Sequence, residues 1–328
     1  MPNAVRYYQT GGPEVLRWED IQVGDPGPGQ VRIRHEAVGL NFADTYFRTG
    51  LYPVQLPAGM GVEAAGVVEA VGPDVTHVRA GDRVTYTGSP LGAYSTERVM
   101  PAAPLIALPD GIGCNTAAAM TMRGLTCAYL LRRIHPLKPG DTVLLHAAAG
   151  GVGLIFTQWA KLLGITVIGT VSTEEKAAVA HANGCDHVLV CPRADSPDNT
   201  AARVREITDG AGVPVVFDSI GAATYATSLK SLARRGLLVC FGTASGPVPP
   251  IDAMELVTGG SLFVTRPALA DYIADPADRA ELAGELFDHV QAGRIRISIN
   301  QRYELADAVQ AHRDLESGRS IGSSVFSL

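Results

Sequence analysis

The chain has 328 residues, of which 46% are hydrophobic, and it carries a formal net charge of −6. This length is enough for two domains of ordinary size, and the charge excludes a basic field that would attract nucleic acid or an anionic membrane. No apolar run approaches the ~20 residues of a membrane span, and the N-terminus lacks the apolar core of a signal peptide, so we expect no membrane partner and a cytoplasmic location.

The first ~120 residues are expected to be rich in β-strands. Short apolar or alternating runs such as QVRIRHEAVGL (30–40) and AAGVVEAVG (64–72) are separated by turn-forming stretches such as GDPGPG (24–29) and RAGDRV (79–84). Turn signals at this close spacing are typical of a small barrel or sandwich.

From about Thr126 the pattern changes to strands that alternate with helices, which predicts a doubly wound parallel sheet. We expect strands at 142–146, 166–171, 187–191, 213–221, 237–243 and 261–267. We expect helices after the glycine turn at 146–153 and at 172–184, 200–210 and 225–236, and a polar loop at 192–200.

After Ala277 we expect a helix at 278–293, a strand at 294–299, a helix at 304–318 and a last strand at 323–328. These elements are expected to rejoin the first domain. The prediction is an α/β chain in which a catalytic domain, residues 1–125 and 268–328, is split around a nucleotide-binding domain, residues 126–267.

The stretch HAAAGGVG, His146 to Gly153, lies between a buried strand and a helix. The first N–H groups of a helix have no partner within it, and the helix dipole is positive at that end, so the turn favours an anion. In a strand–turn–helix unit that opens a doubly wound domain, we predict that the anion is the pyrophosphate of a dinucleotide.

The end of the next strand distinguishes the two nicotinamide cofactors, because a carboxylate there holds the ribose 2′-hydroxyl of NAD. Here Val171 and Ser172 occupy that place, and Ser172 with Glu175 fits a capping box. Lys176, on the first helical turn, can reach a 2′-phosphate. The sequence therefore favours NADPH.

Several stretches together resemble the medium-chain dehydrogenase/reductase superfamily, and within it the zeta-crystallin-like quinone oxidoreductases. They occur in the order GGPEVL (11–16), NFADTYFRTGLYP (41–53), GVEAAGVVEAVG (61–72), AGDRV (80–84), HAAAGGVG (146–153), FDSIG (217–221), VTRP (264–267) and LADAVQAHRDLESG (305–318). The resemblance covers essentially the whole chain. It implies a GroES-like domain split around an inserted Rossmann domain, and a homodimer.

The resemblance also implies a set of cofactor-binding positions. They are Gly150, Gly151 and Val152 at the pyrophosphate, Ser172 and Lys176 at the 2′-phosphate, and Ser219, Phe241, Gly242, Ser245, Arg266 and Arg319 along the rest of the cofactor. Where relatives often have a tyrosine beside the 2′-phosphate, this chain has Cys191. Arg193, two residues on, is a candidate substitute.

A departure from the zinc alcohol dehydrogenases concerns the metal. Their zinc-ligand histidine lies in a G-H-E stretch, whereas this chain has Val62 beside Glu63, and valine cannot bind a metal. The five cysteines form no C-x-x-C pair, and no two histidines have metal-ligand spacing. We therefore expect no metal site. Oxidation of an alcohol passes through an alkoxide, which would be unstabilised without a Lewis acid. Reduction of a quinone is easier, because the quinone accepts hydride to give a delocalised phenolate.

By the resemblance, NFADTYFRTGLYP lies beside the substrate, and its polar and aromatic residues Asn41, Asp44, Tyr46 and Tyr52 are the candidate catalytic residues. Asn41 is expected to hydrogen-bond a quinone oxygen, and the tyrosines to stack on a flat ring or to donate from the phenol. For Asp44 the alternative is that it holds Tyr46 or Arg48 in place.

The sequence thus predicts a zinc-independent, NADPH-dependent quinone reductase that acts on a small molecule. Two alternatives remain: an NADPH-dependent reductase of conjugated C=C bonds in enones, and a non-catalytic NADPH-binding protein of the crystallin-like or RNA-associated kind. The charge of −6 counts against an RNA partner. We expect SLFVTRP, residues 261–267, to form an exposed strand edge through which the homodimer pairs.

Overall fold

The computed structural model describes residues 1–191 and 197–328. The chain divides into two compact units, each described here by itself. Unit 1 comprises Met1–Leu125 and Ala280–Leu328, and unit 2 comprises Thr126–Arg279. Residues 268–279, which the sequence analysis assigns to the split domain, cluster with unit 2.

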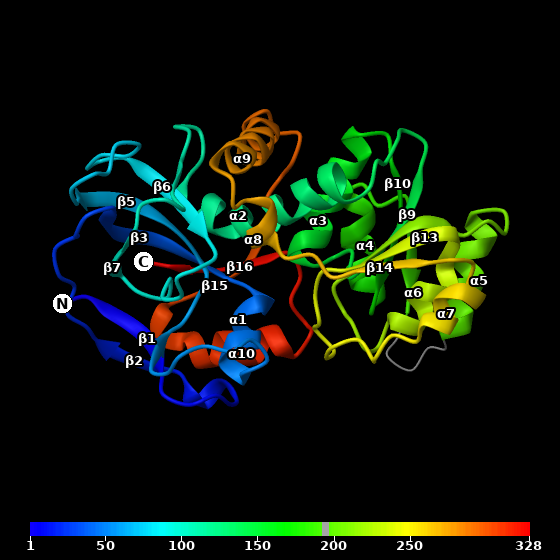
Figure 1. The fold of residues 1–328 in the computed structure, drawn as a ribbon, viewed down its shortest axis with the longest axis horizontal. Helices are drawn as coiled ribbons and strands as arrows, with labels where there is room; N and C mark the ends of the chain where they lie inside the picture. Colours follow the sequence, from blue (N-terminus) through cyan, green and yellow to red (C-terminus); the bar gives the residue numbers. More distant parts are fainter. Residues whose placement is uncertain (192–196) are drawn as a thin grey trace. The chain divides into compact units, whose positions relative to one another are not determined.

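Unit 1 is built around a sheet in the order β15-β16-β3-β5-β6-β8, with β7 also paired to β3, and a second sheet in the order β2-β1-β4. The last strand of the chain lies antiparallel to β3, from Ser324 opposite Leu40 to Ser327 opposite Ala37 (Figure 1). This pairing joins the two ends of the chain in one sheet. The strands are β1 (Asn3–Tyr7), β2 (Arg17–Asp20), β3 (Gln30–Leu40), β4 (Ala58–Gly59), β5 (Glu63–Val71), β6 (Arg83–Thr87), β7 (Glu97–Pro101), β8 (Ile106–Ala107), β15 (Ile299–Tyr303) and β16 (Ser323–Ser327).

The sequence analysis did not predict the helices α1 and α2, and α1 lies in the stretch predicted to bind the substrate. It begins after Asn41 and ends at Gly50, which has a φ of 83° that favours glycine. The α1 helix is Phe42–Thr49 and α10 is Ala308–Glu316. Two helices cross the boundary between the units: α2 (Cys114–Tyr129), which continues into a π-helical turn (Leu130–Ile134), and α9 (Pro276–Gln291). Two short 3₁₀ turns are Pro13–Val15 and Leu305–Asp307.

The strand expected at 294–299 was placed wrongly, because β15 is Ile299–Tyr303. Its partner β16 begins at Ser323, which lies opposite Ile299. Before Ile299, only Ser298 O is bonded to β16, by Ser323 N at 2.8 Å, so the alternating sequence there is not part of the ladder. Ile295 is nevertheless buried.

Unit 2 contains a parallel sheet in the order β11-β10-β9-β12-β13-β14. Relative to the order along the chain this is 3-2-1-4-5-6, the order of the doubly wound dinucleotide-binding fold. The strands are β9 (Thr142–His146), β10 (Thr166–Val171), β11 (His187–Val190), β12 (Val213–Asp218), β13 (Leu232–Cys240) and β14 (Phe263–Thr265).

The helices of unit 2 pack in pairs, α3 on α4 and α5 on α6, and they flank the sheet (Figure 1). They are α3 (Gly151–Leu162), α4 (Glu174–Ala182), α5 (Pro197–Ile207), α6 (Tyr225–Ser231), α7 (Ala253–Thr258) and α8 (Leu269–Tyr272). The predicted polar loop at 192–200 is wrong for 197–200, which begin α5.

The helix expected at 225–236 ends early, at Ser231. From Leu232 the chain is already strand, and Leu232 is buried opposite Val213 of β12. A register shift follows, and Arg235 has a φ of 60°. Burial of Leu232 in the core beside β12 thus overrides a sequence with good helix propensity.

No helix in the described ranges is both long and apolar enough to cross a bilayer. The five cysteines are unbridged, and all but Cys191 are buried.

Candidate active site

The turn between β9 and α3 is built from small residues and glycine. Ala147 has a φ of 57°, and Gly150 is the N-cap of α3 with no side-chain cap on the first N–H groups. A Cβ at Gly153 would lie 2.5 Å from the carbonyl oxygen of Ala147, so a larger residue would distort the turn. The start of α3 therefore offers backbone N–H donors to an external anion. The predicted pyrophosphate positions Gly150, Gly151 and Val152 lie at this helix start.

A buried polar network lies directly before this turn, and the sequence analysis missed it. His146 Nδ1 is 2.8 Å from Thr170 Oγ1, and His146 Nε2 is 3.1 Å from Ser228 Oγ. Ser228 in turn donates to Asp218 Oδ2 at 2.7 Å. Burial lowers the pKa of His146, opposed by the charge of Asp218. The network ties together the carboxyl ends of β9, β10 and β12.

The end of β10 carries the residues predicted for the 2′-phosphate. Ser172 is exposed and Lys176 is half-buried, and Lys176 Nζ lies 3.4 Å from Ser172 Oγ. The capping box of Ser172 and Glu175 was wrong: the N-cap of α4 is Thr173, whose side chain accepts from Lys176 N at 3.3 Å. Ser172 is therefore not required as a cap.

The ends of β12 and β13 bring together four more predicted residues. A Cβ at Gly242 would lie 2.5 Å from Ser219 O, and Phe241 N donates to Asp218 O at 2.8 Å. Ser245 Oγ donates to Ile220 O at 2.8 Å. Because all these strands are parallel, their carboxyl ends lie at the same edge of the sheet as the α3 turn.

Among the described residues, the remaining positions predicted to bind or flank the cofactor come directly after β14 or β11, or lie in unit 1. Arg266 follows β14, and its Nη1 donates to Cys240 O at 2.9 Å. Arg319 belongs to unit 1, where it is exposed and 4.0 Å from Asp314. Cys191 Sγ is 3.2 Å from Thr200 Oγ1, and Arg193 lies outside the described residues.

In unit 1 the predicted substrate residues gather at α1 and its ends. The ring centroids of Tyr46 and Tyr52 are 5.2 Å apart in an edge-on arrangement, and Tyr52 N donates to Tyr46 O at 2.9 Å. Phe42 packs on Tyr46, and Phe47 packs on Tyr52. The four rings, Phe42, Tyr46, Phe47 and Tyr52, are called the aromatic wall below.

The N-cap residue of α1, Asn41, is held by a buried carboxylate. Asn41 Nδ2 donates to Glu63 Oε2 at 2.7 Å, and Met122 N donates to Glu63 Oε1 at 2.6 Å. Arg123 lies 3.5 Å from the same carboxylate. Burial raises the pKa of Glu63, and the Arg123 charge opposes this shift. The GVE stretch at 61–63 was the only local signal for this role of Glu63.

The sequence analysis gave, as an alternative role for Asp44, that it holds Tyr46 or Arg48 in place. The structure shows other partners for its carboxylate. It is fully buried, and its Oδ2 accepts from Asn41 N at 2.8 Å and from the Tyr94 hydroxyl at 2.9 Å. Burial raises the pKa of Asp44 to about 7, partly offset by these hydrogen bonds. Asp44 thus fixes the start of α1 from inside the protein.

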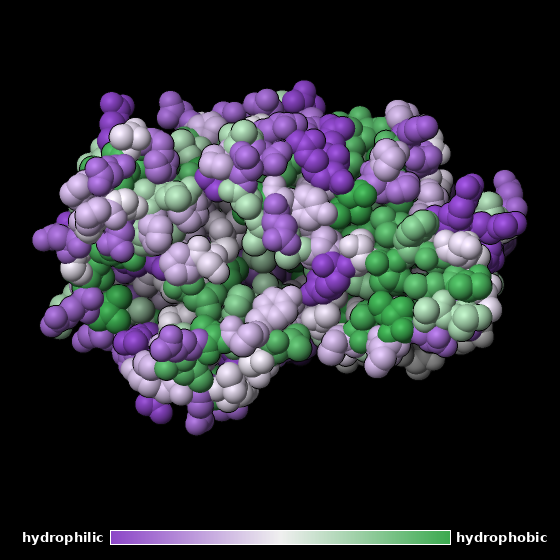
Figure 2. All heavy atoms as spheres, viewed as in Figure 1, coloured by the Kyte–Doolittle hydropathy of each residue, from purple (hydrophilic) through white to green (hydrophobic). Residues whose placement is uncertain are grey.

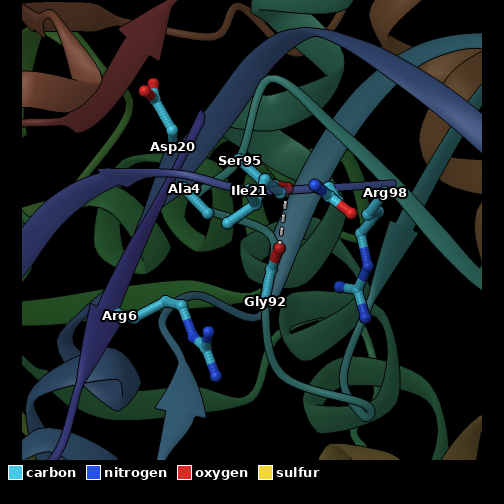
Figure 3. A pocket seen from close by; sticks show the side chains of 9 residues that line it. Ala4, Arg6, Asp20, Ile21, Gly92, Ser95 and Arg98 are labelled. Carbon is cyan, nitrogen blue, oxygen red and sulfur yellow. Dashed lines mark hydrogen bonds between the residues drawn. The ribbon is translucent and has the colours of Figure 1, made fainter. Parts of the chain in front are cut away.

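One surface pocket in unit 1 is not lined by any of these residues. It has a volume of about 380 Å³ and is lined among others by Arg6, Asp20, Ser95 and Arg98 (Figure 3). In both described ranges no three His, Cys, Asp or Glu side chains come together as metal ligands would. Val62 itself is buried.

Comparison with known proteins gives a family for this architecture. Residues 27–110 match the alcohol dehydrogenase GroES-like domain, and residues 151–269 match the zinc-binding dehydrogenase family. The chain is 50% identical to a quinone oxidoreductase of Pseudomonas aeruginosa and 46% identical to a 2-haloacrylate reductase of Burkholderia, with 99% of each chain covered in both cases.

Solved structures agree with these relatives. The Escherichia coli quinone oxidoreductase complexed with NADPH superimposes with a TM-score of 0.96 and 44% identity, over 99% of this chain and 100% of that one. The predicted combination of a GroES-like domain and a Rossmann domain is confirmed. The chain belongs to the quinone oxidoreductases of the medium-chain, zinc-binding dehydrogenase superfamily.

Proposed function

We propose that this protein is an NADPH-dependent quinone reductase that needs no metal ion. The observation that carries the proposal is the uncapped start of α3 at Gly150, which follows the first strand of a sheet of order 3-2-1-4-5-6. Beside it, Ser172 follows β10 where NAD-binding folds have a carboxylate, and Lys176 lies on the first turn of α4. Open backbone donors suit a pyrophosphate, and an ammonium group suits a 2′-phosphate.

NADPH fits the residues at this edge of unit 2. Gly150, Gly151 and Val152 would hold the pyrophosphate, and Ser172 with Lys176 would hold the 2′-phosphate. Ser219, Phe241, Gly242, Ser245, Arg266 and Arg319 are proposed to line the rest of the cofactor. Bound NADPH supplies the hydride, so the protein has mainly to hold and orient the acceptor.

Unit 1 is proposed to bind the acceptor on the aromatic wall. Tyr52 is half-buried and Tyr46 is 8% exposed, so Tyr52 would supply most of the aromatic contact to a quinone ring, with Tyr46 packed edge-on behind it. One hydrogen of Asn41 Nδ2 is directed to Glu63, and we propose that the second is donated to a quinone oxygen. The resulting phenolate is delocalised and can take its proton from water. Val62 in the histidine position removes the ligand on which zinc chemistry depends.

A second candidate reaction is reduction of a conjugated C=C bond, because one relative at 46% identity is named a 2-haloacrylate reductase. The same hydride donor and the same wall serve both acceptors. The loss of NADPH absorbance at 340 nm should be measured with a panel of quinones, enones and 2-haloacrylates, each corrected for the reaction without enzyme. We expect the highest kcat/KM for a quinone.

The same panel decides among the alternatives. Turnover of enones or haloacrylates without turnover of quinones would replace quinone reduction by C=C reduction. NADPH binding without turnover of any acceptor would identify a non-catalytic binding protein.

We further propose a cytoplasmic homodimer that pairs through β14, which ends the sheet order of unit 2. Phe263 on β14 is 60% exposed, and Met254 and Val257 on α7 are 61% and 60% exposed. Figure 2 shows apolar side chains gathered over this part of the surface. An unpaired edge flanked by apolar side chains favours pairing with a second copy.

A further inference from the structure

Inside unit 1, the α1 helix contacts the α10 helix through the side chain of Arg48. Arg48, which is 1% exposed, donates from Nη1 to His312 Nδ1 at 2.9 Å and from Nη2 to Glu316 Oε1 at 2.6 Å. One turn earlier on α1, Asp44 accepts from the Tyr94 hydroxyl, and Tyr94 Oη is 3.2 Å from His312 Nε2. The four buried side chains Asp44, Tyr94, His312 and Arg48 are called the α1 clamp.

The chemistry of the donors places every proton in the α1 clamp. A guanidinium carries only donors, so His312 Nδ1 must accept from Arg48. The neutral ring then carries its proton on Nε2 and donates to Tyr94 Oη, which leaves the Tyr94 hydroxyl to donate to Asp44. Burial and the charge of Arg48 lower the pKa of His312 to about 3, so the neutral ring persists at neutral pH. The donors therefore all run in one direction, from Arg48 to the carboxylate.

The carboxylate at the end of this chain is incompletely satisfied. Asp44 Oδ2 accepts two hydrogen bonds, but Oδ1 has no hydrogen-bond partner among the described residues. The nearby Tyr7 hydroxyl is also buried without one. Removal of a single donor from such a group is costly.

The groups that act on the Asp44 charge come from several elements. Glu63 on β5 raises its pKa and Arg123 on α2 lowers it, as do the bonds from Asn41 and Tyr94. Burial, and after it the charge of Asp44, raises the pKa of Tyr7 on β1. Arg48 on α1 and His312 on α10 act through Tyr94.

We propose that Tyr94 and His312 are positioning residues for the substrate site: through Asp44 they hold the N-terminus of α1, and with it Asn41 and the aromatic wall, in the geometry that binds the acceptor. This inference rests on the proposed quinone reduction. Asp44 reaches the wall through Asn41 N, the N-cap of the helix that carries Tyr46. The phenolate that hydride transfer to a quinone produces would be favoured at this end of a helix.

Tyr94→Phe tests the proposal, with Tyr86→Phe as a matched control. Both tyrosines are buried in unit 1, and both hydroxyls contact a buried histidine, Tyr86 with His35 at 2.9 Å. Only Tyr94 contacts Asp44. Both variants should therefore lose stability, but only Tyr94→Phe should change the substrate site.

For Tyr94→Phe we expect the KM for the quinone to rise by about three- to tenfold, with the NADPH Kd unchanged. In wild type the hydrogen bond from Tyr94 lowers the pKa of Asp44. Its loss in Tyr94→Phe therefore raises that pKa, and the pH dependence of the KM should move to higher pH. His312→Gln, which keeps a side-chain donor for Tyr94, should retain a lower KM than His312→Ala. Tyr86→Phe should keep the wild-type KM and pH profile.

Equal effects of Tyr94→Phe and Tyr86→Phe on KM, or an unshifted pH profile in an active Tyr94→Phe, would overturn the positioning role and leave quinone reduction intact. If wild type turns over no quinone, the proposed function fails. The α1 clamp is then tested by the unfolding free energies of Tyr94→Phe, Asp44→Asn and the double variant. Additive losses would contradict the clamp, and a coupled loss would support it.

Discussion

We propose that the choice between NADPH and NADH is made at single residues, above all at Lys176. Its ammonium group lies beside the exposed hydroxyl of Ser172, where NAD-binding relatives of this fold need a carboxylate. We expect Lys176→Ala to weaken NADPH binding by about tenfold, the lower part of the range for a charge-assisted hydrogen bond, because the site is open to water. NADH, which lacks the 2′-phosphate, should bind as before.

Fluorescence titration with both cofactors measures this difference. Lys161→Ala is the control and should change neither affinity, because Lys161 is exposed and lies at the end of α3 far from the glycine turn. Equal weakening of NADH and NADPH by Lys176→Ala would remove Lys176 from the 2′-phosphate site and make Arg319 the next candidate.

At the scale of elements, local sequence was sufficient where a strand and its helix are adjacent. The β9 strand, the glycine turn and α3 follow directly from buried apolar residues and small residues between Thr142 and Leu162. The α1 helix was not predicted, although its sequence carries a local signal. Asn41 and Asp44 have the spacing of a capping pair, and Asn41 N donates to the Asp44 carboxylate.

Other misses had no local signal. The early end of α6 depends on Leu232 lying opposite Val213, and the start of β15 depends on Ser323. The α1 clamp joins Asp44 to Tyr94 and His312, which are 50 and 268 residues from Asp44, respectively, in the sequence. Such partners become visible only once the two ends of the chain share one sheet.

The edge strand β14 gives a prediction about assembly. Phe263→Asp places a charge on an exposed apolar position of the edge, so we expect it to weaken the dimer by at least about tenfold without unfolding unit 2. Leu162→Asp, another exposed apolar position in unit 2, is the control. Sedimentation across micromolar concentrations measures both; a wild-type protein that is monomeric throughout would refute the homodimer.

For the whole molecule, Asp44 predicts how stability depends on pH. Burial raises its pKa in the folded protein to about 7, above the usual value of 3.8, so between these values the folded protein holds a proton that the unfolded chain has lost. This contribution therefore decreases as pH rises from 4 to 7. His35 and His312, with pKa values lowered to about 4 and about 3 by burial, have the opposite effect below pH 6.5.

The difference between wild type and Asp44→Asn isolates the carboxyl group, because both proteins keep the two histidines. We expect the unfolding free energy of wild type relative to Asp44→Asn to fall by about 2–4 kcal/mol between pH 4 and pH 7. Urea denaturation at several pH values measures it. A constant difference across this range would show that Asp44 does not titrate there.

The central claim, that the molecule reduces quinones with NADPH and without a metal, is tested most directly by one assay. The protein is dialysed exhaustively against a chelator, its zinc content is measured, and NADPH oxidation by a quinone is followed at 340 nm. Because Val62 cannot bind a metal, we predict full activity with far less than one zinc per chain. Activity that disappears with the metal and returns when zinc is added would contradict the account.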